Sequence, residues 1–196
     1  MIKQSLAVRT AVVLLAFLPF ASAAAATHWS LGAYAGQYYD SEPAGAIQGR
    51  ANFSDQYLLA ITGTKTVWRA ATLPLAFELD GMLGQQAGIA SLTEIALAPA
   101  LRWDVGRLAN TVQTALRLAP LGVSYTSVVS PLERGPQGQG DRFLNYLFIE
   151  LELSPSAAPS NAFFVRLHHR CTVYDLLNDY GANGEDFLAL GYRYRF

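Results

Sequence analysis

Apolar and polar residues alternate with a period of two along most of the chain. The stretch "LAFELDG" (75–81) sets Leu, Phe and Leu against Ala, Glu and Asp, and "FLNYLFIELEL" (143–153) repeats the pattern over a longer run. Successive side chains of a β-strand point to opposite faces, so this period predicts strands that each have one apolar face. Turn-like stretches separate eight such strands, at approximately 29–39, 54–64, 73–83, 92–104, 112–125, 143–153, 161–173 and 186–196.

The number and spacing of these strands distinguish two architectures. A soluble sandwich would bury the apolar faces, whereas a transmembrane barrel would turn them toward lipid and keep the charged faces in its lumen. The even count, and segments close to the ~9–11 residues that a tilted strand needs to cross a bilayer, favour the barrel. Connections are long after every odd-numbered strand, at 40–53, 84–91, 126–142 and 174–185. We therefore predict an all-β fold, an eight-stranded antiparallel transmembrane β-barrel of the outer-membrane type.

Both ends of the chain agree with this prediction. The last strand, "FLALGYRYRF", is similar to the closing strand of bacterial outer-membrane barrels, which ends in Phe and is read by the barrel assembly machinery. That resemblance implies the machinery as a partner during biogenesis. At the other end, a basic start, the apolar run "AVVLLAFLPFA" and the small-residue tail "ASAAAA" have the order of a secretory signal peptide. We expect a signal peptide at 1–26, a barrel at 27–196, and a location in the bacterial outer membrane.

The composition argues against nucleic acid as a partner and against an internal disulfide. The net charge is -1 and no basic stripe is present, so nucleic acid is not expected as a partner. The single cysteine leaves no internal disulfide. Charged residues are 15% of the chain and aromatic residues 12%, a balance that suits a surface facing lipid. The sequence leaves open whether the chain forms a homodimer.

The inward faces of the predicted strands collect a nearly balanced set of charges. Such a set can pair internally, and the lumen of an eight-stranded barrel is just wide enough to be filled by side chains. We interpret it as a structural ion-pair network, which disfavours a porin. Its members are Glu78, Asp80, Glu94, Glu150, Glu152, Arg102, Arg117, Arg166, His168, Arg170, Arg193 and Arg195.

The stretch "RLHHRCTVYD" (166–175) carries the candidate chemistry. Alternation along the seventh strand turns His168 into the lumen network, where a structural role is expected, and turns His169 and Cys171 toward lipid. A polar group facing lipid is costly and by default indicates function. The stretch "GPQGQGD" (135–141) lacks the features of a phosphate-binding loop and is interpreted as an external loop.

Residues 161–196 resemble the PagL-like lipid A 3-O-deacylases of Gram-negative outer membranes, in the order Phe, Arg, His-x-Ser and then an acidic residue that opens the last strand. The resemblance implies that His169 is the base, that Cys171 occupies the nucleophile position, and that Asp186 is the acid, with Glu185 as second choice. It further implies hydrolysis of the 3-position acyl ester of lipid A, or lipopolysaccharide, in the outer leaflet, with no cofactor and no metal.

The chain departs from that family at three positions. A thiol replaces the hydroxyl, Thr172 stands where the family usually has an Asn that helps to hold the oxyanion, and Asp replaces Glu. A thiol beside an imidazole can be a good nucleophile, whereas in apolar surroundings it can be inert. The alternatives are therefore a lipid A deacylase and a non-catalytic barrel with a structural, adhesive or envelope-integrity role.

Overall fold

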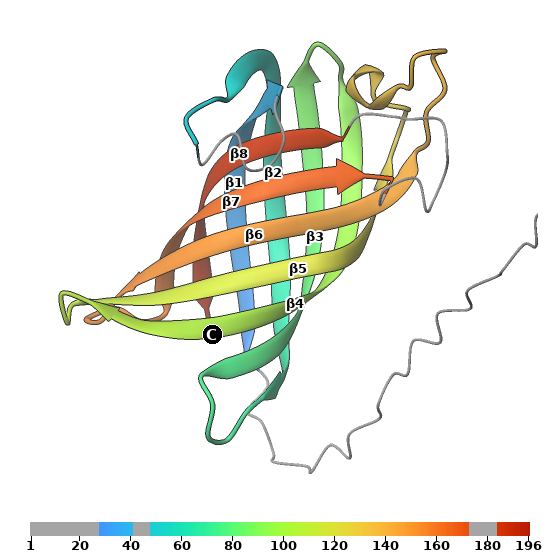
Figure 1. Cartoon of the computed structure of the whole chain (residues 1–196). Coiled ribbons are helices and arrows are strands. Elements are labelled where there is room, and N and C mark those ends of the chain that lie inside the picture. Colours follow the sequence, from blue (N-terminus) through green and yellow to red (C-terminus); the bar gives the residue numbers. More distant parts are fainter. Residues whose placement is uncertain (1–27, 41–47, 173–183) are drawn as a thin grey trace, which may run out of the picture.

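The structure, a computed structural model, describes residues 28–40, 48–172 and 184–196. They form one closed antiparallel barrel whose eight strands are neighbours in sequence order, with β8 paired to β1 (Figure 1). The predicted fold is therefore confirmed. The strands are β1 Trp29–Asp40, β2 Asn52–Arg69, β3 Leu75–Gly88, β4 Leu92–Leu108, β5 Val112–Thr126, β6 Phe143–Pro155, β7 Asn161–Cys171 and β8 Glu185–Arg195.

The burial of side chains follows the predicted alternation. Along most of β2, β3 and β4, buried and exposed residues take strict turns, the exposed ones being mainly apolar and the buried ones small, polar or charged. An outer surface of this composition has no favourable contact with water but is well solvated by lipid. The apolar belt and the charged interior together place the barrel in the bacterial outer membrane.

Exposed aromatic side chains form a girdle at each end of this belt, as they do in outer-membrane barrels. Near the chain termini they are Trp29, Trp103, Phe163, Tyr192, Tyr194 and Phe196, and at the opposite end they are Phe53, Tyr57, Tyr125 and Phe143. We call the first set the terminal girdle and the second the loop-end girdle. They mark the two levels at which the wall meets the lipid headgroups.

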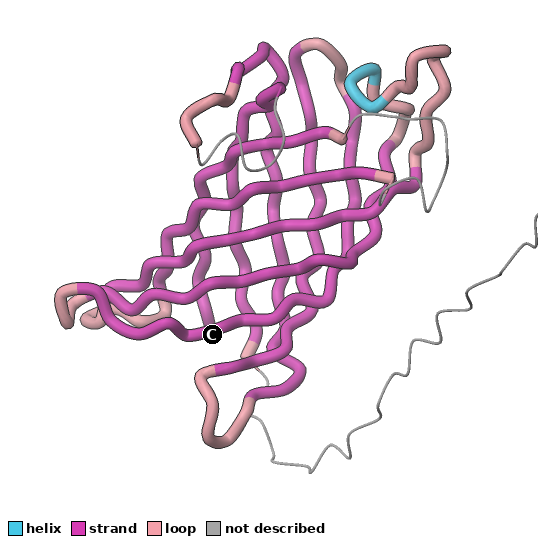
Figure 2. The backbone as a smooth tube through the Cα atoms, in the orientation of Figure 1, coloured by secondary structure: helices cyan, strands magenta, loops and turns pink. Residues whose placement is uncertain are grey.

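Connection lengths differ between the two ends, with one departure from the prediction. At the terminal end the strands are joined by 70–74, 109–111 and 156–160, whereas β1, β5 and β7 finish at the opposite end, before the longer connections to β2, β6 and β8 (Figure 2). Short periplasmic turns and long external loops are the rule for such barrels, so we expect the loop end to be the external one. The long connection predicted at 84–91 is wrong, because β3 runs on to Gly88 and 89–91 make a tight hairpin.

Gln86, one of the polar residues of 84–91, belongs to the lumen rather than to a loop. Gln86 is fully buried inside the barrel, where its side chain bonds Gln56, Glu94 and Glu185. The strands β2 and β4 are likewise longer than predicted, with 18 and 17 residues. The predicted seventh strand continued to 173; Val173 and the predicted signal peptide lie outside the described residues.

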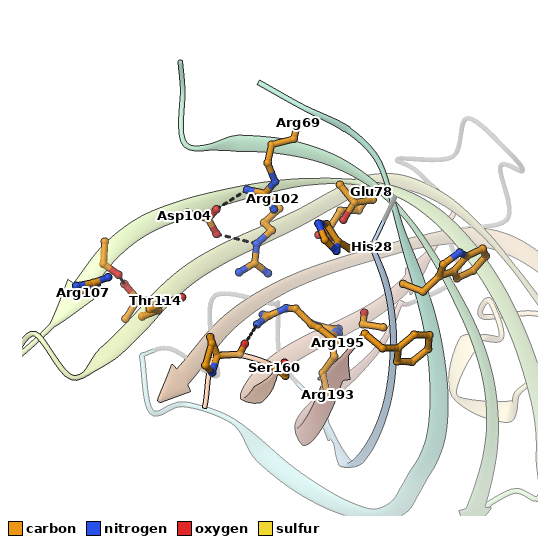
Figure 3. Close-up of a pocket in the computed structure, with 17 residues that line it drawn as sticks. His28, Arg69, Glu78, Arg102, Asp104, Arg107, Thr114, Ser160, Arg193 and Arg195 are labelled. Carbon is orange, nitrogen blue, oxygen red and sulfur yellow. Dashed lines mark hydrogen bonds and ion pairs between the residues drawn. The ribbon is translucent and has the colours of Figure 1, made fainter. Parts of the chain in front are cut away.

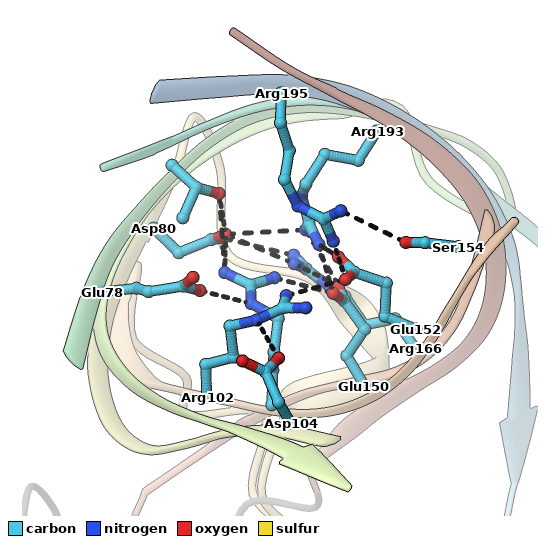
Figure 4. A network of polar contacts seen from close by, with 12 residues as sticks. Glu78, Asp80, Arg102, Asp104, Glu150, Glu152, Ser154, Arg166, Arg193 and Arg195 are labelled. Carbon is cyan, nitrogen blue, oxygen red and sulfur yellow. Dashed lines mark hydrogen bonds and ion pairs between the residues drawn. The ribbon is translucent and has the colours of Figure 1, made fainter. Parts of the chain in front are cut away.

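Most members of the predicted ion-pair network meet inside the barrel (Figure 4), and Arg170 and Glu94 lie nearer the loop end, with Glu133 and Glu185. Arg117, fully buried, reaches Glu78, Asp80 and Glu150 at 2.7, 2.8 and 2.7 Å. Glu150 also pairs with Arg166 and with Arg193, each at 2.6 Å. Buried charges are tolerated when they are paired and hydrogen-bonded, as they are here.

The wall is not uniform around the barrel. The ladders between β6 and β7 and between β7 and β8 run without a register shift. Between β4 and β5 the pairing stops at Leu97 and resumes at Leu101, and the ladder between β5 and β6 shifts at 119–122. Pro99 and Pro120 lie in these breaks, where each lacks the N–H that a ladder needs. In the described part of the chain, no helix is long and apolar enough to cross a membrane.

Candidate active site on the outer wall

The histidine and the first-choice acid predicted from the sequence meet on the outer wall of the barrel. His169 of β7 is the direct cross-strand partner of Asp186 of β8, and its Nδ1 lies 2.8 Å from Asp186 Oδ1. Since the residues on either side of His169 are fully buried in the lumen, the imidazole projects outward. An ionised carboxylate accepts only, so Nδ1 donates and Nε2 is left as the basic nitrogen.

Cys171 lies two residues beyond His169 on the same face of β7. The thiol and the His169 imidazole are close enough to interact. Both side chains are only partly exposed, and Asp186 is 5% exposed although it points away from the lumen. The register of two strands thus assembles a carboxylate, an imidazole and a thiol in one line along the wall.

Two further residues border this line. Asn145 of β6 is the cross-strand partner of Cys171, and its Nδ2 donates to Sγ at 3.8 Å. Gly184 precedes β8, and a Cβ built there would lie 2.7 Å from His169 Cε1 and 2.9 Å from the Arg170 carbonyl oxygen. A side chain at 184 would therefore collide with the imidazole.

Sequence reasoning missed both residues, although one left a signal. Asn145 is the polar member of an outward row that continues through Leu147, Ile149 and Leu151. An amide on a lipid-facing row is as anomalous as a histidine there. Gly184 left none, because a glycine next to a strand is ordinary in any loop.

The second-choice acid and the other histidine lie inside the barrel. Glu185 is fully buried and contacts Arg170, Gln86 and Ser130 in the lumen, so it does not reach His169. His168 shares that compartment: its Nδ1 lies 2.9 Å from the Tyr34 hydroxyl and its Nε2 3.3 Å from Glu94. The neighbouring histidines thus face opposite surroundings.

The connection 127–142 closes over this end of the lumen. In the connection 127–142, the 3-10 helix η1 (Pro131–Glu133) carries the buried Glu133 down to Arg170, 2.5 Å from its guanidinium. Burial raises the pKa of Glu133 well above its usual range, and the carboxylates of Glu185 and Glu94 add to the effect, while Arg170 opposes it. The loop is thereby attached to the inward face of the strand whose outward face carries His169.

A cavity of about 570 Å³ opens at the terminal end of the barrel (Figure 3). Arginines dominate its charged lining, but Arg69 and Arg102 bond to Asp104, and Arg102, Arg193 and Arg195 bond to Glu152. These four arginines are thus paired with carboxylates. The cavity lies at the opposite end of the barrel from His169 and Cys171.

The outer-wall groups are suited to acyl transfer. A thiol, a basic imidazole nitrogen and an orienting carboxylate are the parts of a nucleophile, base and orienter arrangement. Among residues 28–40, 48–172 and 184–196, no group of three or more His, Cys, Asp or Glu side chains is placed to hold a metal ion.

Comparison with known proteins supports the architecture. No family model matches the chain, and no curated protein sequence matches it. Among solved structures, it is similar to the outer membrane enzyme PagL, with 17% identity over 84% of this chain and 98% of that one and a TM-score of 0.56. It is also similar to Neisserial surface protein A, with 12% identity over 86% and 97% and a TM-score of 0.52. At these identities the likeness shows a shared fold, the eight-stranded outer-membrane barrel.

Proposed function

We propose that the chain is an outer-membrane esterase of the lipid A 3-O-deacylase type. The observation that carries the proposal is the line of Asp186, His169 and Cys171 on the outer wall, with a 2.8 Å contact between the imidazole and the carboxylate. Reactive groups that point away from the lumen, on a wall that faces lipid, are placed to serve a substrate that is itself in the membrane.

The level of the site supports an amphipathic lipid as substrate. Phe143 of the loop-end girdle lies two residues before Asn145, which is the partner of Cys171. At about 3.3 Å per residue, the thiol is within about 7 Å of the level of that girdle along the strand. Acyl esters of a membrane lipid lie at this depth, between headgroups and hydrocarbon, and lipid A occupies the outer leaflet.

The proposed reaction is nucleophilic hydrolysis in two stages. His169 Nε2 takes the thiol proton while Sγ attacks the carbonyl carbon of the 3-position ester, whose π electrons move to oxygen. Collapse expels the 3-alkoxide, which takes the proton from His169 and leaves an acyl thioester on Cys171. Water, deprotonated by His169, then attacks the thioester and releases the 3-hydroxy fatty acid and the thiol.

Mass spectrometry of lipid A from cells with and without the protein tests the proposal. Expression should remove one 3-hydroxyacyl chain, and Cys171→Ser, which restores the family's nucleophile, should retain or raise that activity. The control Cys171→Ala should show no loss of the chain. Unchanged lipid A under wild-type expression would instead favour the non-catalytic barrel with a structural, adhesive or envelope-integrity role.

Surface labelling tests the orientation on which the proposal depends. A cysteine-directed label introduced at Gln137, in a Cys171→Ser background, should react from outside intact cells. One introduced at Ala157, in the connection 156–160, should react only after the envelope is opened. The reverse pattern would place the thiol near the inner leaflet and end the lipid A proposal.

A further inference from the structure

Asn145 occupies a position that packing alone does not explain. It points outward from β6, in a row that otherwise presents Leu147, Ile149 and Leu151, and only 5% of it is exposed. A buried amide costs free energy unless its hydrogen bonds are made, and an apolar side chain would satisfy a lipid-facing wall at no such cost.

The amide is directed at the reacting atom. Asn145 and Cys171 are directly opposed on adjacent strands, and the Nδ2–Sγ distance of 3.8 Å is that of an N–H donor to sulfur. His169 approaches the same thiol along β7, from two residues away. The sulfur therefore lies between a proton acceptor on its own strand and a proton donor on the neighbouring strand.

We propose that Asn145 is a further catalytic residue, which stabilises first the Cys171 thiolate and then the oxyanion of the tetrahedral intermediate; the second part rests on the proposed function. When Sγ bonds to the ester carbon, the sulfur loses its negative charge and the former carbonyl oxygen gains it. That oxygen is two bonds from Sγ, so a donor aimed at the thiolate is near the place where the new charge appears. A fixed donor at such a position acts only on the charged states, which is what lowers a barrier.

This assignment accounts for one departure of the chain from the family it resembles. Thr172, which follows the nucleophile position, has no side-chain amide to offer. Asn145 supplies one from the adjacent strand, and the uninterrupted ladder between β6 and β7 fixes its distance from the sulfur. The donor is thus held by strand register rather than by a loop.

Alkylation of the chain's single cysteine tests the first part without any substrate. The full-length protein, folded in detergent micelles, is treated with iodoacetamide over a range of pH. In Asn145→Leu and in the near-isosteric Asn145→Asp, the pH midpoint of alkylation should rise, and the rate at pH 7 should fall about tenfold to hundredfold, as for a lost hydrogen bond to a charged group. Asn161→Leu makes the same exchange at the far end of β7, where Asn161 bonds Tyr192, and should match the wild type.

Turnover on lipid A tests the second part. Both Asn145 variants should lose about a hundredfold to thousandfold in kcat with little change in KM, which is the effect of removing one oxyanion donor. Heat-modifiable mobility identifies variants that fold, and only these are compared. Superimposable alkylation profiles, or unchanged turnover in a folded variant, would overturn the assignment while leaving the deacylase proposal intact. If the wild type does not deacylate lipid A, the proposed function fails, and the alkylation profiles alone decide the role of Asn145 at the thiol.

Discussion

His168 and His169 are consecutive in the chain and yet belong to different parts of the molecule. His168 is enclosed in the lumen, where its ring lies 4.9 Å from that of Tyr146 and 5.6 Å from that of Phe187, between centroids. His169 lies on the outer wall in contact with Asp186. One step along a strand exchanges a packed, enclosed site for one that faces the membrane.

The difference between the two histidines shows a division of roles, in which the lumen contributes to stability and the outer wall carries the candidate chemistry. The lumen holds most of the buried charge, satisfied by pairing within the barrel, so its side chains are committed to one another. The outer wall needs almost no polar groups, so those it carries at His169, Cys171, Asp186 and Asn145 call for another explanation. The same strand can therefore serve both purposes, because its alternate side chains point into different surroundings.

Replacing each histidine separately by alanine tests most directly whether the outer wall carries the chemistry and the lumen the stability. His169→Ala should reduce lipid A deacylation to background, a loss of about a thousandfold or more, because both proton transfers need the imidazole. Its heat-modifiable mobility should stay that of the wild type. His168→Ala should do the reverse, lowering the free energy of unfolding by about 1–3 kcal/mol through lost hydrogen bonds and packing. Full activity in His169→Ala would refute the mechanism.

The two acids at the start of β8 give a second pair. Asp186→Asn should lower kcat about a hundredfold or more, because the amide cannot stabilise the imidazolium or fix its tautomer. Glu185→Gln, one residue away but inside the barrel, should leave kcat within a few-fold of the wild type. Single-turnover kinetics on lipid A in micelles would measure both, and equal losses would show that the two faces are coupled.

Substitutions in the lumen network should lower the free energy of unfolding, whereas substitutions on the outer wall should lower activity. Glu150→Ala leaves Arg117, Arg166 and Arg193 short of a buried counter-charge, so the free energy of unfolding should fall by about 3–5 kcal/mol. The matched change at the exposed pair, Asp104→Ala, should cost about 1 kcal/mol or less. Urea titration of the refolded protein in detergent, followed by gel mobility, would measure both, and equal costs would contradict a structural role for the buried network.

The smallest expected effect is at Gly184. In Gly184→Ala the new methyl group must displace the imidazole or the adjoining backbone, and a shift of the ring away from the thiol should lower kcat about tenfold. Gly63→Ala is the control, since a Cβ there comes no closer than 3.9 Å to a neighbouring side chain. Unchanged turnover in Gly184→Ala would mean that the ring relaxes without cost.

The alternation of apolar and polar residues was sufficient to predict the closed barrel, the inward charges and the outward position of His169 and Cys171, because side-chain direction in a strand follows from position alone. It failed at 84–91, where small and polar residues, among them the lumen-facing Gln86, have the composition of a loop. Cross-strand partners such as Asn145 and Cys171 depend on register, which loops and bulges set over long sequence separations. The ion pair between Glu133 and Arg170 could not be predicted from the sequence for the same reason.

The breaks beside Pro99 and Pro120 make the resistance of the barrel wall to deformation differ from one strand pair to the next. When a bilayer changes thickness, we expect a small closed barrel to deform first where a ladder is interrupted, as it is between Leu97 and Leu101 at the seam of β4 and β5. The continuous ladders of β6, β7 and β8 lie away from this seam and stay stiff. We therefore expect the spacing of the outer-wall groups to change little when the membrane thickens or thins, because the strands that carry them lie in continuous ladders.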